Sequence, residues 1–233
     1  RGLSITCMAK VVVVRVPAGD GQCRLNKTSV ETLVRELKEA QSKADVIILT
    51  GEGRFFCNGL DIEYMKTLGD SAPTFVRSVQ SLLLLVLLSP APIVAALNGH
   101  TFGAGAMLAM ACDFRVMAKT QGWLCVPAVS LGYAPLPTGM FLVLKNKLPP
   151  ASWTRILVLG ERIDAQAAAA LGVIDVCCEP GDVQRSASAA AATLTKRNLD
   201  GDALVAMRRQ IFPDVIAALT SSVGVEQSPL SRL

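Results

Sequence analysis

The sequence predicts one α/β domain in which strands and helices alternate along most of the chain and only helices follow near its C-terminal end. Short apolar runs that fit buried strands recur at residues 11–16, 46–49, 93–97, 114–117, 123–126 and 173–177. Of the 233 residues, 51% are hydrophobic and 18% are charged, a composition that supports a large core and argues against disorder.

The first part of the chain is expected to contain two strands and two helices. The run 11–16 is closed by a Pro-Ala-Gly turn, and a helix over residues 28–43 follows, with Thr28 and Glu31 at capping-box spacing. After the strand 46–49, residues 50–61 form a loop with three glycines. A second helix begins near Pro73 and is closed by Pro90, because proline is tolerated in a first helical turn and not in the interior.

The stretch Ile93–Asp113 organises the middle of the chain. A strand over 93–97 stops at Asn98-Gly99, and a helix-compatible run over 106–111 begins just after Gly103-Ala104-Gly105. Small residues let a ligand approach the backbone, and the first N–H groups of a helix lack partners within it, so this turn suits a developing negative charge. A tight strand-to-helix turn without a ligand is the alternative. Neither phosphate-loop nor dinucleotide-binding spacing is present.

The rest of the chain is expected to contain two strands, a proline-rich loop and a series of helices. The strands 114–117 and 123–126 are followed by the loop 127–137, which holds three prolines. Helices are expected over residues 138–145, 152–159, 164–172, 182–196, 201–210 and 214–221, with the strand 173–177 after the third of these.

Charge, cysteine usage and hydropathy exclude several classes of protein. The net charge is only +4, and no basic cluster is interleaved with aromatic residues, which argues against nucleic-acid binding. Seven cysteines without framework spacing indicate a reducing compartment, and a single histidine gives little support for a metal site. The most apolar tract, 82–97, contains two prolines and is shorter than the ~20 residues of a membrane helix, so membrane insertion is not expected.

Four segments in order resemble the crotonase, or enoyl-CoA hydratase/isomerase, superfamily. They are Gly51–Asp61 (GEGRFFCNGLD), Ala95–Asp113, Leu124–Gly132 and Leu159–Asp175. Among its branches the chain is most similar to peroxisomal Δ3,Δ2-enoyl-CoA isomerases. The resemblance implies a spiral of ββα turns over residues 1–178 and a C-terminal helical region over 179–233 that makes the contacts of a homotrimer or a dimer of trimers.

The resemblance also implies a substrate and an oxyanion hole. Family members bind an acyl-CoA thioester as substrate, without a further cofactor, and hold its carbonyl oxygen with two backbone N–H groups. By position these belong to Leu60 and Ala104. Paired donors aimed at the oxygen of an enolate stabilise its charge as it develops, which agrees with the reading of the glycine turn as a site for negative charge.

One position departs from the family pattern. The base that moves a proton from C2 to C4 in an isomerase is a Glu, but Ala128 stands at its place in Pro127–Gly132. Met107 occupies the place of the second hydratase Glu, which rules against hydration by two carboxylates. Three explanations are open: loss of activity with retained acyl-CoA binding, deliberate replacement of Glu, or another base. Candidates for another base are Asp61, Glu63, Tyr133, His100 and Cys125.

Each of these candidates also has an ordinary structural role. Asp61 suits a helix cap, Glu63 a solvated helix face and His100 a hydrogen-bonding turn. A phenol such as that of Tyr133 is a poor base at neutral pH, and Cys125 fits a core thiol without a visible His partner. Ser130 likewise lacks a visible His and Asp pairing, which argues against a serine protease.

The resemblance suggests further contacts with the substrate. Arg24 and Leu25 lie where family members line the CoA, although Arg24 also fits an ordinary exposed loop residue. The remaining candidates flank the oxyanion donors or line the acyl tunnel: Cys57, Asn58, Gly59, Phe102, Gly103, Leu131 and Tyr133.

The chain ends in Ser231-Arg232-Leu233, which differs from the peroxisomal address Ser-Lys-Leu by one basic residue. We therefore expect a peroxisomal protein that engages the import receptor and shifts the double bond of a 3-enoyl-CoA to the 2-trans position in fatty-acid β-oxidation. The alternatives are an inactive acyl-CoA-binding or assembly subunit and another enolate-based reaction.

Overall fold

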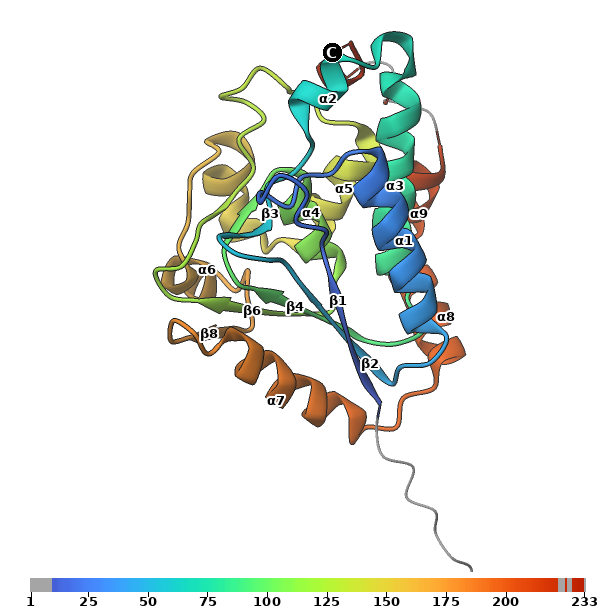
Figure 1. Ribbon diagram of the computed structural model, residues 1–233, viewed down its shortest axis with the longest axis vertical. Coiled ribbons are helices and arrows are strands. Elements are labelled where there is room, and N and C mark those ends of the chain that lie inside the picture. Colours follow the sequence, from blue (N-terminus) through green and yellow to red (C-terminus); the bar gives the residue numbers. More distant parts are fainter. Residues whose placement is uncertain (1–9, 222–224, 226–227, 233) are drawn as a thin grey trace, which may run out of the picture.

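The computed structural model describes residues 10–221, 225 and 228–232 (Figure 1). The strands are β1 Val11–Arg15, β2 Val46–Thr50, β3 Phe55–Cys57, β4 Ile93–Leu97, β5 His100–Phe102, β6 Phe114–Ala118, β7 Leu124–Cys125 and β8 Val176–Cys178. The α-helices are α1 Lys27–Gln41, α2 Ile62–Lys66, α3 Ala72–Leu87, α4 Ala104–Ala111, α5 Thr138–Lys147, α6 Ala165–Ala170, α7 Val183–Thr195, α8 Gly201–Ile211 and α9 Pro213–Thr220. Short 3₁₀ segments lie at Gly69–Ser71, Pro150–Ser152 and Pro229–Arg232, and a π-helical turn at Thr154–Val158.

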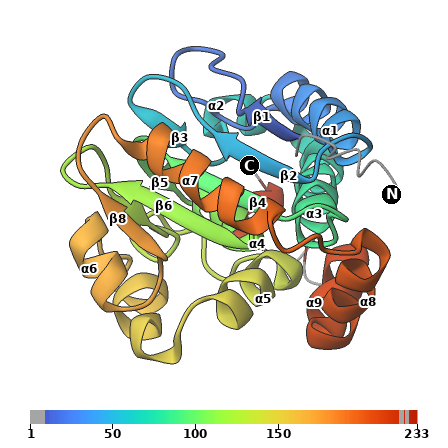
Figure 2. The same cartoon turned by 90° about the horizontal axis from the view of Figure 1, so that it is seen from below.

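A five-stranded parallel sheet in the order β1-β2-β4-β6-β8 forms the centre of the fold. Its middle strands are buried on both faces, which explains why β2 and β4 read as continuous apolar runs. Helix α7 crosses one face of this sheet (Figure 2). It packs Val183, Ala187 and Ala191 against Ile48, Val94 and other residues of the strands. The opposite face packs against α1, α3 and α4 in the main core.

A second, three-stranded parallel sheet has the order β3-β5-β7. Each of its strands follows a strand of the larger sheet along the chain: β3 follows β2, β5 follows β4, and β7 follows β6. A helix comes next in each case, so the chain repeats a ββα unit. The predicted α/β fold with a ββα spiral and C-terminal helices is confirmed.

Asn98 holds successive turns of this spiral together. Its side-chain oxygen accepts from the Gly51 N–H at 2.9 Å, and its amide donates to the carbonyls of Gly53 and Phe55, both at 3.2 Å. A Cβ at Gly99 would lie 2.1 Å from the Arg54 carbonyl oxygen, so only glycine permits this close packing of backbones. The Asn98-Gly99 turn therefore places β5 directly beside β3.

The structure corrects several predicted elements. The segment 50–61 was expected to be a loop but contains β3, and β5 lies between two runs that were expected to join through a turn. The N-cap of α1 is Asn26, whose side chain accepts from Ser29 N–H in a capping box, so the predicted Thr28 and Glu31 pairing is wrong. Helix α4 begins at Ala104, two residues earlier than expected.

The C-terminal helices contact the core through apolar packing and through an ion pair. Helix α7 covers the large sheet, and α9 packs against α5 and α3. The guanidinium of Arg208 on α8 donates at 2.8 Å to both carboxylate oxygens of Asp113, which also accepts from the Ile93 N–H. Within the residues that the structure describes, no helix combines the length and apolar character needed to cross a membrane. The predicted division at residue 178 stays a prediction.

Candidate active site

A pocket of about 340 Å³ lies between the C-terminal ends of β3 and β5, the segment after β7, and helix α5. It brings together residues from parts of the chain far apart in sequence. Its lining is Asn58, Gly59, Leu60, Ile62, Phe102, Gly103, Ala104, Met107, Cys125, Val126, Pro127, Ala128, Ser130, Leu131, Tyr133, Leu136, Met140, Gly160, Arg162 and Leu230. Nine of the twelve predicted site residues are in this list.

Leu60 presents a backbone N–H group to the pocket. The segment after β3 pairs with Leu25, which donates to the Gly59 carbonyl at 2.8 Å and accepts from the Asp61 N–H at 2.9 Å. Successive N–H groups of an extended chain point to opposite sides, so the N–H of Leu60 points away from Leu25. It donates a hydrogen bond to no other described residue.

Ala104 supplies a second such N–H group at the first position of α4, where helix geometry leaves the donor without an intrahelical acceptor. Gly103 before it has a φ of 52° and donates to the Cys125 carbonyl at 2.9 Å. A Cβ at Gly59 would lie 2.8 Å from the Phe102 carbonyl oxygen and 3.2 Å from the Ala104 nitrogen. This contact sets the two backbone segments side by side, with both free N–H groups in one pocket.

Ala128 forms part of the facing wall. Residues 127–133 make a compact turn in which Tyr133 N–H donates to the Ala128 carbonyl at 2.8 Å and Leu131 N–H to the Pro127 carbonyl at 3.0 Å. The Ala128 side chain is buried and faces the cavity from the position that the resemblance gives to the catalytic Glu. Met107 lines the pocket at the position of the second hydratase Glu. Among the described lining residues there is no Asp, Glu or His.

Three of the alternative bases lie outside the pocket lining. Asp61 caps α2 by accepting from the Tyr64 N–H at 3.2 Å, and Glu63 is exposed and paired with Lys66 at 2.8 Å. His100 lies in β5 between the rings of Phe55 and Phe102, with ring centroids 5.3 and 5.1 Å away. Its Nδ1 is buried without a hydrogen-bond partner among the described residues, so the predicted role in a hydrogen-bonding turn is wrong. The ordinary roles predicted for Asp61 and Glu63 are confirmed by these contacts.

The other two candidates are on the pocket wall. Cys125 donates its thiol to the Gly160 carbonyl at 3.1 Å, and burial raises the pKa of this thiol, with Arg162 opposing the shift. A thiol with a raised pKa is a poor proton acceptor at neutral pH. Tyr133 is half-buried and lines the cavity. In the described part of the chain, no three His, Cys, Asp or Glu side chains gather as a metal site requires.

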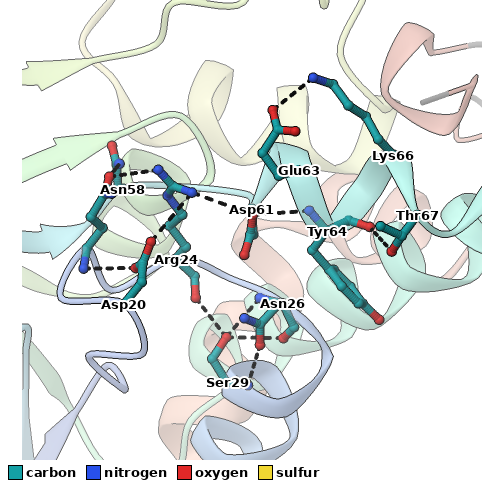
Figure 3. Close-up of polar contacts among 11 residues, drawn as sticks. Asp20, Arg24, Asn26, Ser29, Asn58, Asp61, Glu63, Tyr64, Lys66 and Thr67 are labelled. Carbon is teal, nitrogen blue, oxygen red and sulfur yellow. Dashed lines mark hydrogen bonds and ion pairs between the residues drawn. The ribbon is translucent and has the colours of Figure 1, made fainter.

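Arg24 lies outside the pocket lining, in a polar network next to Asn58 (Figure 3). Its guanidinium pairs with Asp20 at 3.5 Å and Asp61 at 3.7 Å. Gln22 joins Arg24 to Asn58, because its side-chain oxygen accepts from both, at 2.9 and 2.8 Å. A contact between Arg24 and the phosphates of CoA stays a prediction.

Leu25 and Cys57 lie in the core and are absent from the pocket lining. Burial raises the pKa of the Cys57 thiol to about 12, and both side chains are inaccessible. The prediction that these two residues contact substrate is therefore restricted to their backbone atoms. Seven lining residues were not singled out from the sequence: Ile62, Val126, Leu136, Met140, Gly160, Arg162 and Leu230. The only signal for any of them is that Val126, Gly160 and Arg162 lie in quoted family segments.

Comparison with known proteins agrees with this geometry. The family model described as enoyl-CoA hydratase/isomerase matches residues 9–227. Enoyl-CoA delta isomerase 2, peroxisomal, of Arabidopsis thaliana is 28% identical over 224 residues, covering 91% of this chain and 92% of the relative. Enoyl-CoA delta isomerase 3 of the same plant is 30% identical over 195 residues, covering 80% of this chain and 81% of the relative.

Solved structures show the same fold. An enoyl-CoA hydratase from Mycobacterium marinum superposes with a TM-score of 0.80 at 24% identity, covering 92% of each chain. The apo form of an Mtb enoyl-CoA isomerase gives a TM-score of 0.84 at 23% identity, covering 95% of this chain and 96% of that one. Because the sequence identity is low, these likenesses support the fold alone.

Proposed function

This chain belongs to the enoyl-CoA hydratase/isomerase family, and on that premise we propose that it binds an acyl-CoA thioester and acts in the isomerisation of a 3-enoyl-CoA to the 2-trans-enoyl-CoA. The thioester carbonyl oxygen would lie between the N–H groups of Leu60 and Ala104. The acyl chain would extend along the apolar side of the pocket, formed by Met107, Met140 and Leu230.

The observation that carries this proposal is the pair of N–H groups without acceptors on one pocket wall. When a proton leaves C2 of the acyl chain, negative charge moves onto the thioester oxygen. Fixed donors that already point at that oxygen stabilise the enolate without reorganising, and this stabilisation is commonly the largest single contribution to such catalysis. A single unpaired N–H group would support ligand binding less specifically than a converging pair.

The proton transfer is the step that the pocket supports least. An isomerase needs a group that accepts the C2 proton and returns it at C4, and the methyl group of Ala128 cannot do so. Two lining residues near Ala128 carry a hydroxyl, Ser130 and Tyr133, and that of Ser130 donates to the Pro127 carbonyl at 3.1 Å. In a chain that turns over we assign the proton-carrying role to Tyr133, because Ser130 is engaged in this bond and Asp61, Glu63 and His100 lie outside the pocket.

A second candidate function is favoured by the carboxylate-free pocket. In this alternative the chain binds acyl-CoA without turning it over and acts as an assembly partner of active subunits. The oxyanion donors would then serve binding alone. The backbone geometry is the same in both cases, so the two functions differ only in the presence of a competent base.

Isomerisation of a 3-enoyl-CoA by the native chain, Ala128→Glu and Ala128→Gln separates the two functions. Glu restores a proton acceptor, whereas Gln has the same shape and cannot accept a proton. We expect Ala128→Glu to exceed Ala128→Gln by about 10²–10⁴-fold, the usual contribution of general base catalysis. Turnover by the native chain supports the enzyme, whereas a silent native chain that binds acyl-CoA supports the binding protein. Absence of acyl-CoA binding in all three would refute the proposed function.

Peroxisomal location and trimer formation are parts of the same proposal. The name of the Arabidopsis delta isomerase 2 places that relative in peroxisomes, and this chain ends in Ser231-Arg232-Leu233. Leu233 and the side chains of Ser231 and Arg232 lie outside what the structure describes. A fluorescent protein fused before the full chain should reach peroxisomes, and deletion of the last three residues should abolish this. Sedimentation equilibrium tests the trimer.

A further inference from the structure

Arg162 is the one charged residue among those that line the pocket in the described part of the chain. Its backbone position is fixed, because Ile163 and Leu124 exchange hydrogen bonds of 2.8 and 2.9 Å and Cys125 donates to the Gly160 carbonyl. Its guanidinium lies 5.7 Å from the centroid of the Phe102 ring. Phe102 lines the same pocket, just before the oxyanion turn, so the cation is held beside the place of the thioester.

The neighbouring acids are engaged elsewhere. Glu161 pairs with Arg155 at 2.6 Å, and Asp164 caps α6 by accepting from the Ala167 N–H at 2.8 Å. Arg162 forms no ion pair with any described residue. Its charge acts on the surroundings: burial, Arg54 and Arg162 together lower the pKa of His100. Arg162 is itself exposed, so an unpaired, solvent-accessible cation borders the apolar, carboxylate-free interior of the pocket.

A CoA thioester has two kinds of anionic group that a guanidinium can bind. The phosphates are separated from the thioester by the long pantetheine arm, whereas Arg162 shares one cavity of about 340 Å³ with the oxyanion donors. Because Arg162 and the oxyanion donors line one cavity, we assign an anion that Arg162 binds there to the acyl group and not to the distant phosphates. Guanidinium matches a carboxylate through paired N–H donors.

We propose that Arg162 selects acyl-CoA thioesters whose acyl group carries a carboxylate. This inference rests on the proposed function and specifies its substrate class. Arg162 would bind the carboxylate while Leu60 and Ala104 hold the thioester oxygen, so the acyl group is fixed at both ends. The substrate is thus selected by its carboxylate, through Arg162, and by its thioester oxygen, through the two N–H groups.

Binding of matched thioesters tests the proposal. The probes are glutaryl-CoA and its methyl ester, whose acyl group is neutral, together with the corresponding pantetheine thioesters, which lack phosphates. Each probe is titrated calorimetrically into the native chain, Arg162→Gln and Arg155→Gln. Arg155 is the matched control, because it lies on the same segment, is paired with Glu161 and does not line the pocket. We expect the native chain and Arg155→Gln to bind glutaryl-CoA about tenfold more tightly than the methyl ester, and Arg162→Gln to lose this preference.

The pantetheine probes separate the two anionic groups. An Arg162-dependent preference that persists in glutaryl-pantetheine supports recognition of the acyl carboxylate. If Arg162→Gln weakens both CoA probes equally and neither pantetheine probe, Arg162 meets a phosphate and the proposal is wrong. A native chain that binds both CoA probes equally also overturns the proposal and leaves the proposed function intact. If no thioester binds, both fail.

Discussion

Two walls of the same pocket differ in what they are made of. The wall at Gly59-Leu60 and Gly103-Ala104 offers backbone N–H groups, whereas the wall at residues 126–133 offers side chains. The backbone wall holds the N–H groups of Leu60 and Ala104 without acceptors among the described residues, whereas the side-chain wall has Ala128 where the resemblance places a catalytic carboxylate. A backbone donor survives any side-chain substitution that leaves the local conformation intact. A base disappears with one substitution.

This contrast separates what the packed core supports from what a single side chain supplies. The N–H groups of Leu60 and Ala104 depend on the pairing of β3 with β5, which the core supports, so they keep their positions as long as the chain folds. The base depends on one residue type. Substitutions can perturb each wall separately, and their expected effects differ in size.

The largest effect is expected from Ala104→Pro. Proline is compatible with the first helical position, and its ring carbon Cδ replaces the N–H hydrogen, so one oxyanion donor is lost and an apolar methylene takes its place. In an Ala128→Glu background we expect kcat/KM to fall by about 10²–10³-fold. The infrared stretch of a bound thioester carbonyl, which polarisation lowers, should move back toward its solution value even without turnover.

Ala104→Ser is the control for this prediction, because serine retains the N–H group at the same position. If Ser and Pro variants lose equal activity and equal carbonyl polarisation, the loss comes from packing and the oxyanion assignment is wrong.

A smaller effect is expected from Gly59→Ala, measured as the free energy of unfolding in urea. Gly59 has a φ of 81°, and a Cβ there would lie 2.8 Å from the Phe102 carbonyl oxygen. Backbone strain alone costs about 1–3 kcal/mol, and the clash adds to it. Gly53→Ala is the matched control: its φ is 60° and a Cβ would meet no atom within 4 Å. Equal destabilisation by the two variants would contradict close packing at Gly59.

The smallest effect concerns pH. Burial, with Arg54 and Arg162, lowers the pKa of His100, so the folded state disfavours its charged form. The unfolded state then binds the proton more readily, and stability should fall as pH drops through about 6.5, the ordinary value for histidine. Because His100 is the single histidine of the chain, His100→Gln should flatten this slope between about pH 7 and pH 5.5. If the slope is unchanged in His100→Gln, the pH dependence of stability comes from carboxylates and not from His100.

The parts of the fold that the sequence predicted are those with long apolar periodicity. Strands β2 and β4 and helices α1 and α3 have enough residues for a pattern to emerge. Strands β3 and β5 have three residues each and exist because they pair with one another across 45 residues or so of chain, a contact that no local pattern reports. The misplaced capping box has a local cause. Asn26 and Thr28 both suit the N-terminal cap of α1, and the helix begins after Asn26.

The same distinction holds for the site. Leu60, Ala104 and Ala128 were placed by resemblance, because they lie in contiguous motifs, and the structure brings them to one pocket. Arg162 and Leu230 reach that pocket only through tertiary folding, so neither stands out in a linear sequence. From the sequence, Arg24 fitted either a contact with CoA or an exposed loop residue, and no local pattern could show that Asp20 and Asp61 would both pair with it.

One contact links the pocket to the order in which the chain is made. Leu230 closes part of the cavity, and Ser228 donates to the Pro135 carbonyl at 2.8 Å, a bond between residues 93 positions apart. A nascent chain on the ribosome can form the ββα core and both oxyanion donors well before residue 230 leaves the exit tunnel. During that interval the apolar pocket is open on one side. The pocket is therefore a late product of synthesis, completed only after the rest of the core has folded.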